Sequence, residues 1–289
     1  MTTSNPASTP GSRRGWLAWS VGALLFAYAF FHRVSPSVMY DHLMADFAVS
    51  AAVLGNLAAC YFYAYAAMQL PVGLMVDRWG PRRLLIAAAL TAGLGSLLFA
   101  LATTLAWAYA ARLLIGAGSG LIFIATLKLA TLELPPERFA LVTGLTMAVA
   151  MTGAVGGQAP LAALVEAIGW RWAMGLGAAL GAALALLVWL SARGSGGPAG
   201  AQARRPADAA PASVLASLKA VLANPQTWNA GLFSACMSGP MLSFGVLWAV
   251  PYLVQVHGLA RAEAGFGASL MLIGWAFGAP GFGWLSDRL

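Results

Sequence analysis

The strongest constraint on this chain is its series of long apolar segments. A helix needs about 20 mainly apolar residues to cross the hydrocarbon core of a bilayer. Eight runs of residues meet that length: 16–40, 51–76, 84–104, 107–132, 139–165, 172–191, 227–252 and 264–285. Short connections between most of them make successive helices antiparallel neighbours. The sequence therefore predicts an all-α membrane protein with eight spans.

Composition agrees with a lipid environment. Of the 289 residues, 60% are hydrophobic and 9% are charged, which leaves too few charges to cover a soluble surface. The net charge of +7 does not indicate a nucleic-acid partner, because the basic residues are spread over short loops. Cys60 and Cys236 fall inside apolar runs, so we expect no disulfide framework and no metal site. We expect no cofactor either.

The chain divides into four segments by composition. Residues 1–15 form a Ser-, Thr- and Pro-rich tail, and residues 16–191 hold six spans. Residues 192–226 are rich in Gly, Ala, Arg and Pro, which indicates a flexible linker, with a short interfacial helix expected at 212–222. Residues 227–289 hold the last two spans. The first run is too long for a signal peptide and is interpreted as a retained helix.

The distribution of basic residues predicts the orientation. With the N-terminus in the cytoplasm, eleven of the 16 Lys and Arg residues lie on the cytoplasmic side and only Arg171 and Arg261 lie outside. The remaining three, Arg33, Arg112 and Lys128, lie within spans. This bias follows the positive-inside rule. We therefore expect a cytoplasmic-membrane protein whose N-terminus and linker face the cytoplasm.

A repeat relates the second and the eighth span. Gly73-Leu-Met-Val-Asp77-Arg78 ends one and Gly283-Trp-Leu-Ser-Asp287-Arg288 ends the other, at an offset of 210 residues. Both spans run in the same direction, so the pattern indicates a parallel repeat of six-helix halves. By that logic, the second half would contain four more helices than the two present here.

Three motifs resemble those of the major facilitator superfamily. The segment Gly73 to Arg83 is similar to that family's G-x-L-x-D-R-x-G-R-R loop signature, with Pro81 as a departure. Arg112 to Gly118 resembles its R-x-x-x-G-x-G motif, and Gly153 to Pro160 its Gly/Pro-rich motif in the fifth span. The resemblance implies a complete N-terminal six-helix bundle, the first two helices of a C-terminal bundle, and alternating access between the two.

The resemblance also implies gating residues. A carboxylate such as Asp77 would bias one access state through contacts with the other bundle. The alternative for this loop is a solvated positive-inside segment. Glycine pairs and Pro160 would allow close packing, sliding or bending of the fifth span. The expected gating residues are Gly73, Asp77, Arg78, Gly80, Arg82, Arg83, Gly153, Gly157, Pro160, Gly283, Asp287 and Arg288.

Cations inside the spans carry the most specific chemistry. All nine acidic residues lie outside the spans or at their edges, so an anionic solute is a plausible counter-charge. The segment Phe31 to Ser35 resembles the R-x-x-S pattern of the anion:cation symporter branch; in the phosphate-ester carriers of that branch, an arginine at the position of Arg33 binds the substrate anion. Snorkelling of Arg33 to the headgroups is the alternative. The seventh span lacks the second arginine of phosphate-ester exchangers, which leaves a monocarboxylate, an amino acid or a neutral solute open.

Further cavity residues are expected on the second and fourth spans. Arg112 and Lys128 are sixteen residues apart, which places them about 160° apart on a straight helix, so they cannot both face one cavity. Arg112 is the better candidate; Lys128 is also a cavity candidate, with snorkelling at the cytoplasmic end as its alternative. Tyr61, Tyr65 and Gln69 form one stripe, which would orient a solute or make interhelical hydrogen bonds. His32 is a possible proton site.

The function expected from these features is secondary active transport, with symport of a proton or ion, of a small organic and anionic solute by a monomer in the lipid bilayer. The alternatives are a solute sensor that does not transport and a truncated, inactive carrier. No nucleophile–base pair or phosphate loop occurs in the spans, so an enzyme is not expected.

Overall fold

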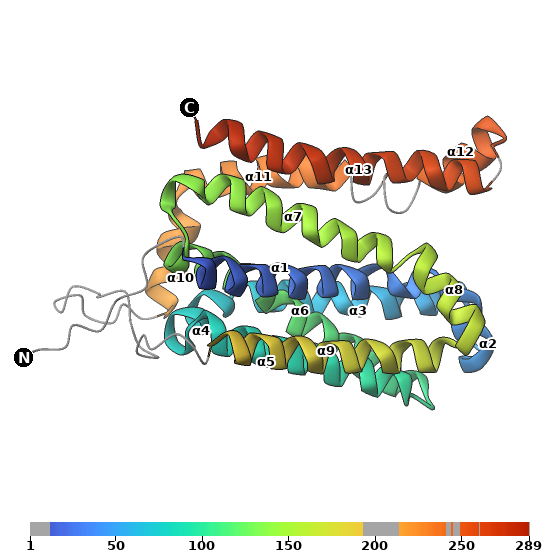
Figure 1. The fold of residues 1–289 in the computed structure, drawn as a ribbon. Coiled ribbons are helices and arrows are strands. Elements are labelled where there is room, and N and C mark those ends of the chain that lie inside the picture. The colour runs from blue at the N-terminus through green and yellow to red at the C-terminus, as the bar shows by residue number, and fades with distance from the viewer. Residues whose placement is uncertain (1–11, 193–213, 241–243, 245–248, 260, 289) are drawn as a thin grey trace, which may run out of the picture. The chain divides into compact units, whose positions relative to one another are not determined.

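The computed structural model describes residues 12–192, 214–240, 244, 249–259 and 261–288, and within these every regular element is a helix. The described residues belong to two compact units, residues 1–200 with 276–289, and residues 201–275. The first part of the chain contains α1 (Arg13–Val34), η1 (Ser35–Ser37), α2 (Tyr40–Phe47), α3 (Ala51–Gln69), α4 (Val72–Trp79), α5 (Pro81–Ala100), α6 (Leu105–Glu133), η2 (Pro136–Arg138), α7 (Phe139–Gly156), α8 (Ala159–Ile168) and α9 (Trp170–Ala192) (Figure 1).

The later part of the chain contains α10 (Val214–Ala223), α11 (Pro225–Pro240), α12 (Ala249–His257) and α13 (Arg261–Ser286). Helix α10 lies where the short linker helix was expected. Most of the expected linker, residues 193–213, lies outside the described residues, as do residues 1–11 of the tail. The seventh predicted span corresponds to α11 and α12 with undescribed residues between them, and the eighth to the continuous α13.

Five segments of the described chain are long and apolar enough to cross a membrane. They are Arg13–Ser37, Pro81–Ala100, Leu105–Glu133, Pro136–Ile168 and Trp170–Ser191. A sixth is obtained when α2 and α3, which are bent by 113°, are counted together. These segments correspond to the six spans expected before the linker. We name the two ends of this bundle the N-terminal end, where α1 begins, and the α2 end.

The predicted spans end or break at prolines and glycines. The second span was expected to be continuous over 51–76, but α3 ends at Gln69 and α4 begins after Pro71, which lacks a backbone donor. The fifth span is interrupted at Gly157 and Gln158. Pro160 was expected to kink that span, and it lies in the first turn of α8, where a missing N–H costs no helical hydrogen bond.

Helix α6 lies at the centre of the first unit, where it contacts α1, α3 and α5. Glycines on α6 permit these close approaches. A Cβ built on Gly116 would overlap the backbone of Tyr61 on α3, and one on Gly118 would lie 2.7 Å from the carbonyl oxygen of Ala88 on α5. Small residues thus let the helix backbones pack closely, which is the main source of helix association in lipid.

Helices α1 and α7 pack along a second glycine-lined contact. A Cβ built on Gly153 would overlap the carbonyl oxygen of Ala27, and one on Gly157 would lie 2.8 Å from the carbonyl oxygen of Phe31. Toward the N-terminal end, the Trp19 indole donates to the Thr146 hydroxyl at 3.0 Å. The α1–α7 contact therefore depends on glycine at its tightest points.

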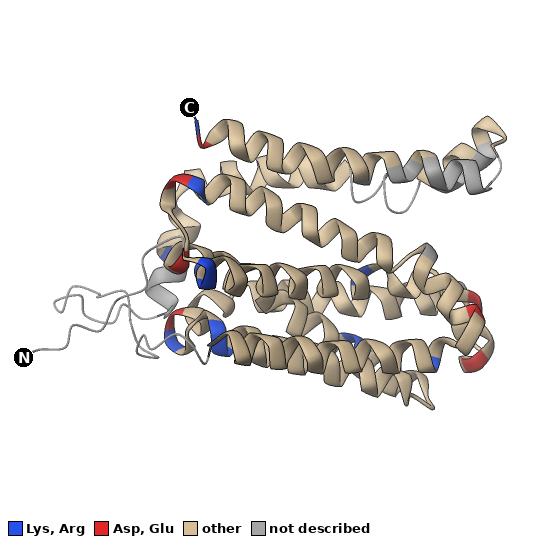
Figure 2. Cartoon of the chain, viewed as in Figure 1, with Lys and Arg blue, Asp and Glu red and all other residues tan. Residues whose placement is uncertain are grey.

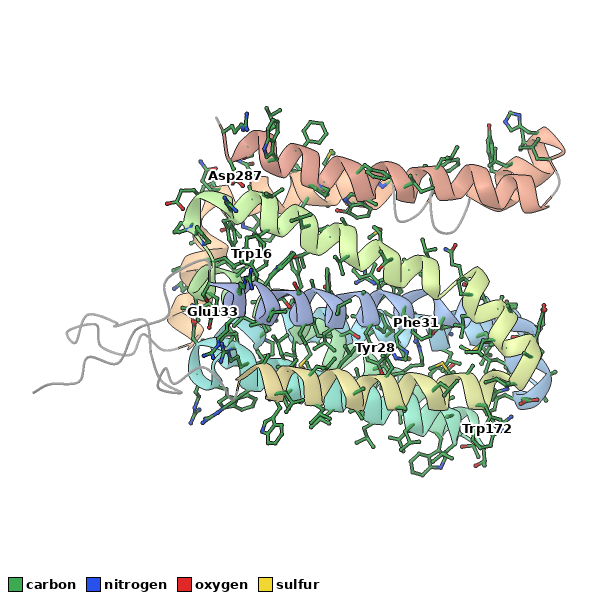
Figure 3. The ribbon with its side chains drawn as sticks, viewed as in Figure 1. Trp16, Tyr28, Phe31, Glu133, Trp172 and Asp287 are labelled. Atoms are coloured by element: carbon green, nitrogen blue, oxygen red, sulfur yellow. The ribbon has the colours of Figure 1, made fainter. Side chains whose placement is uncertain are left out.

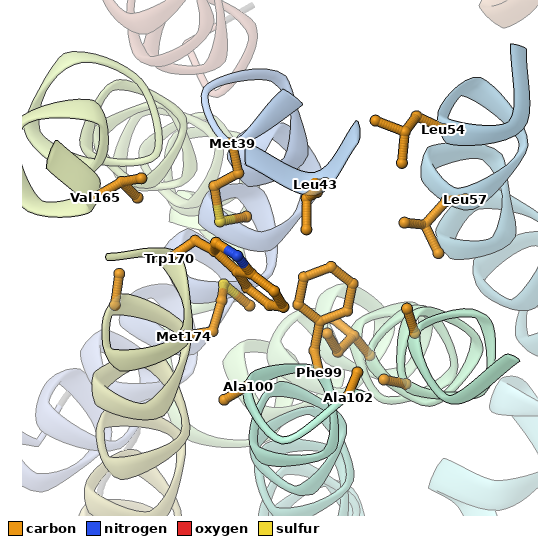
Figure 4. Close-up of a cluster of buried hydrophobic side chains, with 14 of the residues drawn as sticks. Met39, Leu43, Leu54, Leu57, Phe99, Ala100, Ala102, Val165, Trp170 and Met174 are labelled. Carbon is orange, nitrogen blue, oxygen red and sulfur yellow. The ribbon is translucent and has the colours of Figure 1, made fainter. Parts of the chain in front are cut away.

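Charged residues gather at the two ends of the helices, with few in between (Figure 2). Glu133 and Trp16 lie at the N-terminal end, whereas Trp172 lies at the α2 end (Figure 3). At the α2 end, apolar residues of α2, α3, α5 and α9 form a buried cluster (Figure 4). Its larger members include Met39, Leu43, Phe99 and Trp170. Helix α2 is therefore packed onto the end of the bundle.

We predict that Gly153→Ala destabilises the protein, because the added methyl group meets the fixed backbone of α1 at Ala27. Overpacking of this kind costs about 1–3 kcal/mol. Gly156→Ala on the same helix is the matched control, since no atom lies within 4 Å of its added Cβ. Thermal unfolding in detergent measures both variants. A midpoint that is equal for Gly153→Ala and Gly156→Ala would contradict the tight α1–α7 contact.

Candidate functional site

Arg33 lies near the end of α1 among aromatic rings. The carbon atom of its guanidinium is 4.2 Å from the centre of the Phe30 ring, 5.2 Å from Tyr65, 5.7 Å from Phe62 and 5.8 Å from Tyr61. Its buried Nε has no hydrogen-bond partner. Ring faces attract a cation, so these side chains partly compensate the charge of Arg33.

Arg112 is the most buried cation of the bundle's described residues, with a side chain that is 1% exposed. Its Nη1 donates to the main-chain carbonyl of His32 at 2.8 Å, and its guanidinium carbon lies 5.1 Å from the Tyr61 ring centre. The Nε and Nη2 atoms have no partner. A buried cation with unmet donors is costly, so Arg112 is unusual among the charged residues that the structure describes.

Tyr61 lies close to both arginines. Since both guanidinium carbons are within 6 Å of its ring centre, they are at most about 11 Å apart. The phenol is fully buried, and its hydroxyl donates to the carbonyl of Ala29 at 3.1 Å. Within the described chain, neither arginine has a carboxylate within ion-pair distance. The structure thus brings Arg33, Tyr61 and Arg112 together in one site.

Tyr65 and Gln69 continue the stripe along α3. The Tyr65 ring stacks on Tyr61 with centroids 6.0 Å apart. The Gln69 amide donates to the carbonyl of Gly120 at 3.3 Å, so this residue makes the interhelical hydrogen bond that was the alternative for the stripe. The tyrosines lie beside the arginines, whereas Gln69 lies about one turn beyond Tyr65 toward the N-terminal end.

His32 is completely buried behind the arginines. Its ring lies edge-on to Tyr28 with centroids 4.5 Å apart, and neither ring nitrogen has a hydrogen-bond partner. A Cβ built on Gly177 of α9 would lie 3.6 Å from the ring, so His32 faces α9. The His32 side chain therefore points toward α9, whereas the Arg33 side chain lies beside the aromatic rings of α3, although the two residues are adjacent in sequence.

Lys128 lies away from this site, at the N-terminal end of the bundle. Its Nζ forms a 2.8 Å ion pair with Asp77, in which the lysine side chain is 36% and the aspartate 66% exposed. Arg82 forms a second ion pair with Glu133 at 2.8 Å and is better buried. The two pairs connect α4 and α5 to the end of α6. Sequence reasoning did not identify Glu133, because its partner depends on helix register.

The remaining expected gating residues of this region lie in α4, at its C-terminal end and in the first turn of α5. Arg78 and Arg83 lie on the surface, and Gly73 has open space where a Cβ would be. Gly80 ends α4 with a φ of 80°, a backbone conformation that favours glycine. Gly80 therefore allows the chain to turn directly into α5 at Pro81.

Asp287 contacts the start of α7. Its two carboxylate oxygens accept hydrogen bonds from the backbone N–H groups of Ala140 and Leu141, at 3.0 and 2.8 Å. A Cβ built on Gly283 would lie 2.5 Å from the carbonyl oxygen of Ala140. A carboxylate at a helix N-terminus is stabilised by the unpaired donors and the helix dipole. Arg288 stacks on Trp284 at 4.0 Å.

A polar group at the α2 end was not identified from the sequence. Asp46 on α2 accepts a hydrogen bond from the Trp170 indole at 2.9 Å and pairs with Arg171. These interactions, the Trp170 hydrogen bond first, lower the pKa of Asp46. The sequence signal that could have indicated this group is the pair Trp170 and Arg171 directly after Gly169. Among the described residues, no cluster of three His, Cys, Asp or Glu side chains is placed to bind a metal ion.

Comparisons with known proteins agree with this architecture. Residues 20–289 match the Major Facilitator Superfamily. A probable sulfoacetate transporter, SauU of Cupriavidus necator, is 28% identical over 151 residues, which cover 52% of this chain and 35% of that protein. A multidrug resistance protein B homolog of Mycobacterium tuberculosis is 32% identical over 136 residues, covering 47% of this chain and 25% of that protein.

A solved structure shares the fold. The structure of the proton:xylose symporter XylE bound to 6-bromo-6-deoxy-D-glucose superposes with a TM-score of 0.56 at 15% identity, over 95% of this chain and 68% of that one. The aligned segment thus spans only part of each relative's length. The apolar helices and the family match over residues 20–289 together show that this chain is a multi-pass membrane protein of the Major Facilitator Superfamily.

Proposed function

We propose that this protein is a secondary active transporter of a small organic anion that works by alternating access. The observation that carries the proposal is that the guanidinium groups of Arg33 and Arg112 both lie within 6 Å of the ring centre of Tyr61 on α3. Neither has a carboxylate partner in the described chain, and three of their buried nitrogen atoms are unbonded.

An anion is favoured over a neutral solute on energetic grounds. A charged side chain in the membrane interior requires a partner or a wet cavity. The rings around Arg33 supply a weak partner for the cation, but an anionic group supplies a stronger one through hydrogen bonds between charged groups. The probable sulfoacetate transporter is named for an organic anion, which agrees with this choice. The multidrug protein and the xylose symporter are relatives with other solutes.

Asp287 and the glycines near it support a gating role. The carboxylate binds the first N–H groups of α7, and Gly283 and Gly144 allow close backbone approach between α13 and α7 at the same place. An interaction that exists in only one access state biases the equilibrium between the two states. We assign Asp77 with Lys128, Arg82 with Glu133, and exposed Arg78 and Arg83 to the same gating region.

The orientation proposed is that of a cytoplasmic membrane protein with its N-terminus in the cytoplasm. Basic residues at the N-terminal end of the bundle include Arg13, Arg14, Arg82 and Arg83, whereas the α2 end carries Arg171. This asymmetry follows the positive-inside rule. We further propose that the protein acts as a monomer and that residues 16–191 form the first six-helix bundle and 227–289 the opening of a second, with His32 a candidate for proton coupling.

We predict that Arg33→Gln weakens the binding of sulfoacetate by at least about tenfold, because hydrogen bonds to charged groups contribute about 1.5–3 kcal/mol. Arg33→Lys should lose less, since it keeps the charge but not the two-pronged geometry. The measurements are the thermal shift induced by sulfoacetate in detergent and sulfoacetate uptake into proteoliposomes.

Arg13→Gln is the matched control, since it removes an exposed charge from the start of the same helix. Xylose serves as the neutral probe and should give no shift. Unchanged sulfoacetate affinity in Arg33→Gln contradicts the anion site. Binding without uptake contradicts transport and favours the sensor.

We predict that Asp287→Ala changes the apparent affinity for sulfoacetate more than Asp287→Asn does. Asparagine retains an oxygen acceptor for the N–H groups at 140 and 141, whereas alanine removes both acceptors. A charge at a helix terminus typically contributes about 0.3–1 kcal/mol, so the shift expected is roughly twofold to fivefold.

Uptake kinetics and thermal unfolding of both Asp287 variants are compared with the parent protein. If the unfolding midpoint falls while the KM of uptake is unchanged, Asp287 is a structural helix cap and has no role in gating.

A further inference from the structure

Helix α2 has an apolar face that fixes it to the end of the bundle. Met39, Leu43 and Phe47 recur at four-residue spacing, which places them on one side of the helix. Met39 and Leu43 are fully buried in the cluster at the α2 end, and Phe47 packs on Trp170 with ring centroids 6.0 Å apart (Figure 4). Apolar packing thus holds α2 against the end of the bundle. Because such packing is non-directional, it does not by itself fix the orientation of the helix.

A single carboxylate oxygen adds the directional contact. Oδ2 of Asp46 accepts from the Trp170 indole N–H at 2.9 Å and from the guanidinium of Arg171. Arg171 also donates to the carbonyl of Ala102, just after α5, at 3.4 Å. The carboxylate therefore connects α2 to the first turn of α9 and, through Arg171, to the end of α5.

This contact differs from an ordinary surface ion pair, which contributes little. The Trp170 side chain is only 4% exposed, so without Asp46 its buried N–H would lose its acceptor. The Arg171 guanidinium stacks on the same indole at 4.3 Å. Gly169, with a φ of 81°, makes the turn from α8 that places both residues in the first turn of α9.

The connection from α2 back to α1 is short and internally bonded. Ser35 donates to the carbonyl of His32 at 3.2 Å, and Ser37 donates to that of Val34 at 2.7 Å. The His32 carbonyl also accepts from Arg112. A displacement of α2 would therefore be transmitted to the last turn of α1, which carries Arg33.

We propose that Asp46 is a positioning residue: by binding Trp170 and Arg171 it holds the corner between α1 and α2 against α9 and so keeps Arg33 among its aromatic rings. We call this set of contacts the Asp46 latch. The role of Arg33 in this statement rests on the proposed anion site. The latch itself depends only on the contacts at the α2 end.

The first measurement tests the latch without any ligand. In a Cys60→Ser, Cys236→Ser background, spin labels are attached to cysteines at the exposed positions Ser37, beside α2, and Leu176, on α9. Pulsed electron–electron resonance then gives the distance distribution between them. We expect Asp46→Asn and Trp170→Phe to broaden it and Asp46→Glu to leave it closer to the parent. Glu166→Gln, which removes an exposed carboxylate from α8, is the matched control and should have no effect.

The second measurement tests the consequence for binding. Sulfoacetate affinity is measured by thermal shift on the same variants without labels. We expect Asp46→Asn to weaken it by about fivefold to tenfold, because small displacements of a binding group are costly, while Glu166→Gln binds as the parent does.

The outcomes separate the two proposals. An unchanged distance distribution in Asp46→Asn overturns the latch. A broadened distribution with unchanged affinity overturns the positioning of Arg33 by Asp46. Failure of the parent protein to bind sulfoacetate refutes that anion as the solute, and the distance measurement then decides the latch by itself.

Discussion

The structure depends on the absence of water from the bilayer core. There, each backbone N–H and C=O must be satisfied inside the protein, which restricts the chain to helices and makes every interruption of a helix notable. In the first unit, the interruptions occur next to Pro71 and at Gly157 and Gln158. Because of the same constraint, most charged residues lie at helix ends, where water or lipid headgroups can solvate them. The two arginines that remain in the interior are therefore the exceptions that require an explanation.

Arg33 and Arg112 are compensated in different ways. Arg33 is placed among four aromatic rings, and Arg112 is bonded to a backbone carbonyl at the end of α1. Neither arrangement supplies a negative charge. The two cations thus lie among tyrosine and phenylalanine side chains without a carboxylate partner in the described chain, which is the basis of the proposed anion site. The ion pairs at the N-terminal end, in contrast, are complete within the chain.

Much of the fold could be predicted from the sequence, because hydropathy and motif spacing depend on local residues alone. The six spans before the linker and the separation of Arg112 from Lys128 follow from helix length and from the 100° turn per residue. The positions at which the second and fifth spans are interrupted could not be predicted, since one proline is compatible with several positions of an interruption. Pairs such as Arg82 with Glu133, or Asp46 with Trp170, depend on the register between helices, which no short segment encodes. The hydrogen-bond acceptor of Arg112 is a main-chain carbonyl. Since every residue has such a carbonyl, the sequence does not indicate which one is used.

The interruption of the fifth span gives its two pieces different neighbours. Helix α7 packs on α1 and is capped by Asp287, whereas α8 packs on α9. The joint at Gly157 lies against the backbone of Phe31, one turn from the end of α1. A rigid rod would carry any tilt from one membrane surface to the other undiminished. A segment interrupted at Gly157 does not have to tilt as one piece, because α7 is oriented by its packing on α1 and α8 by its packing on α9.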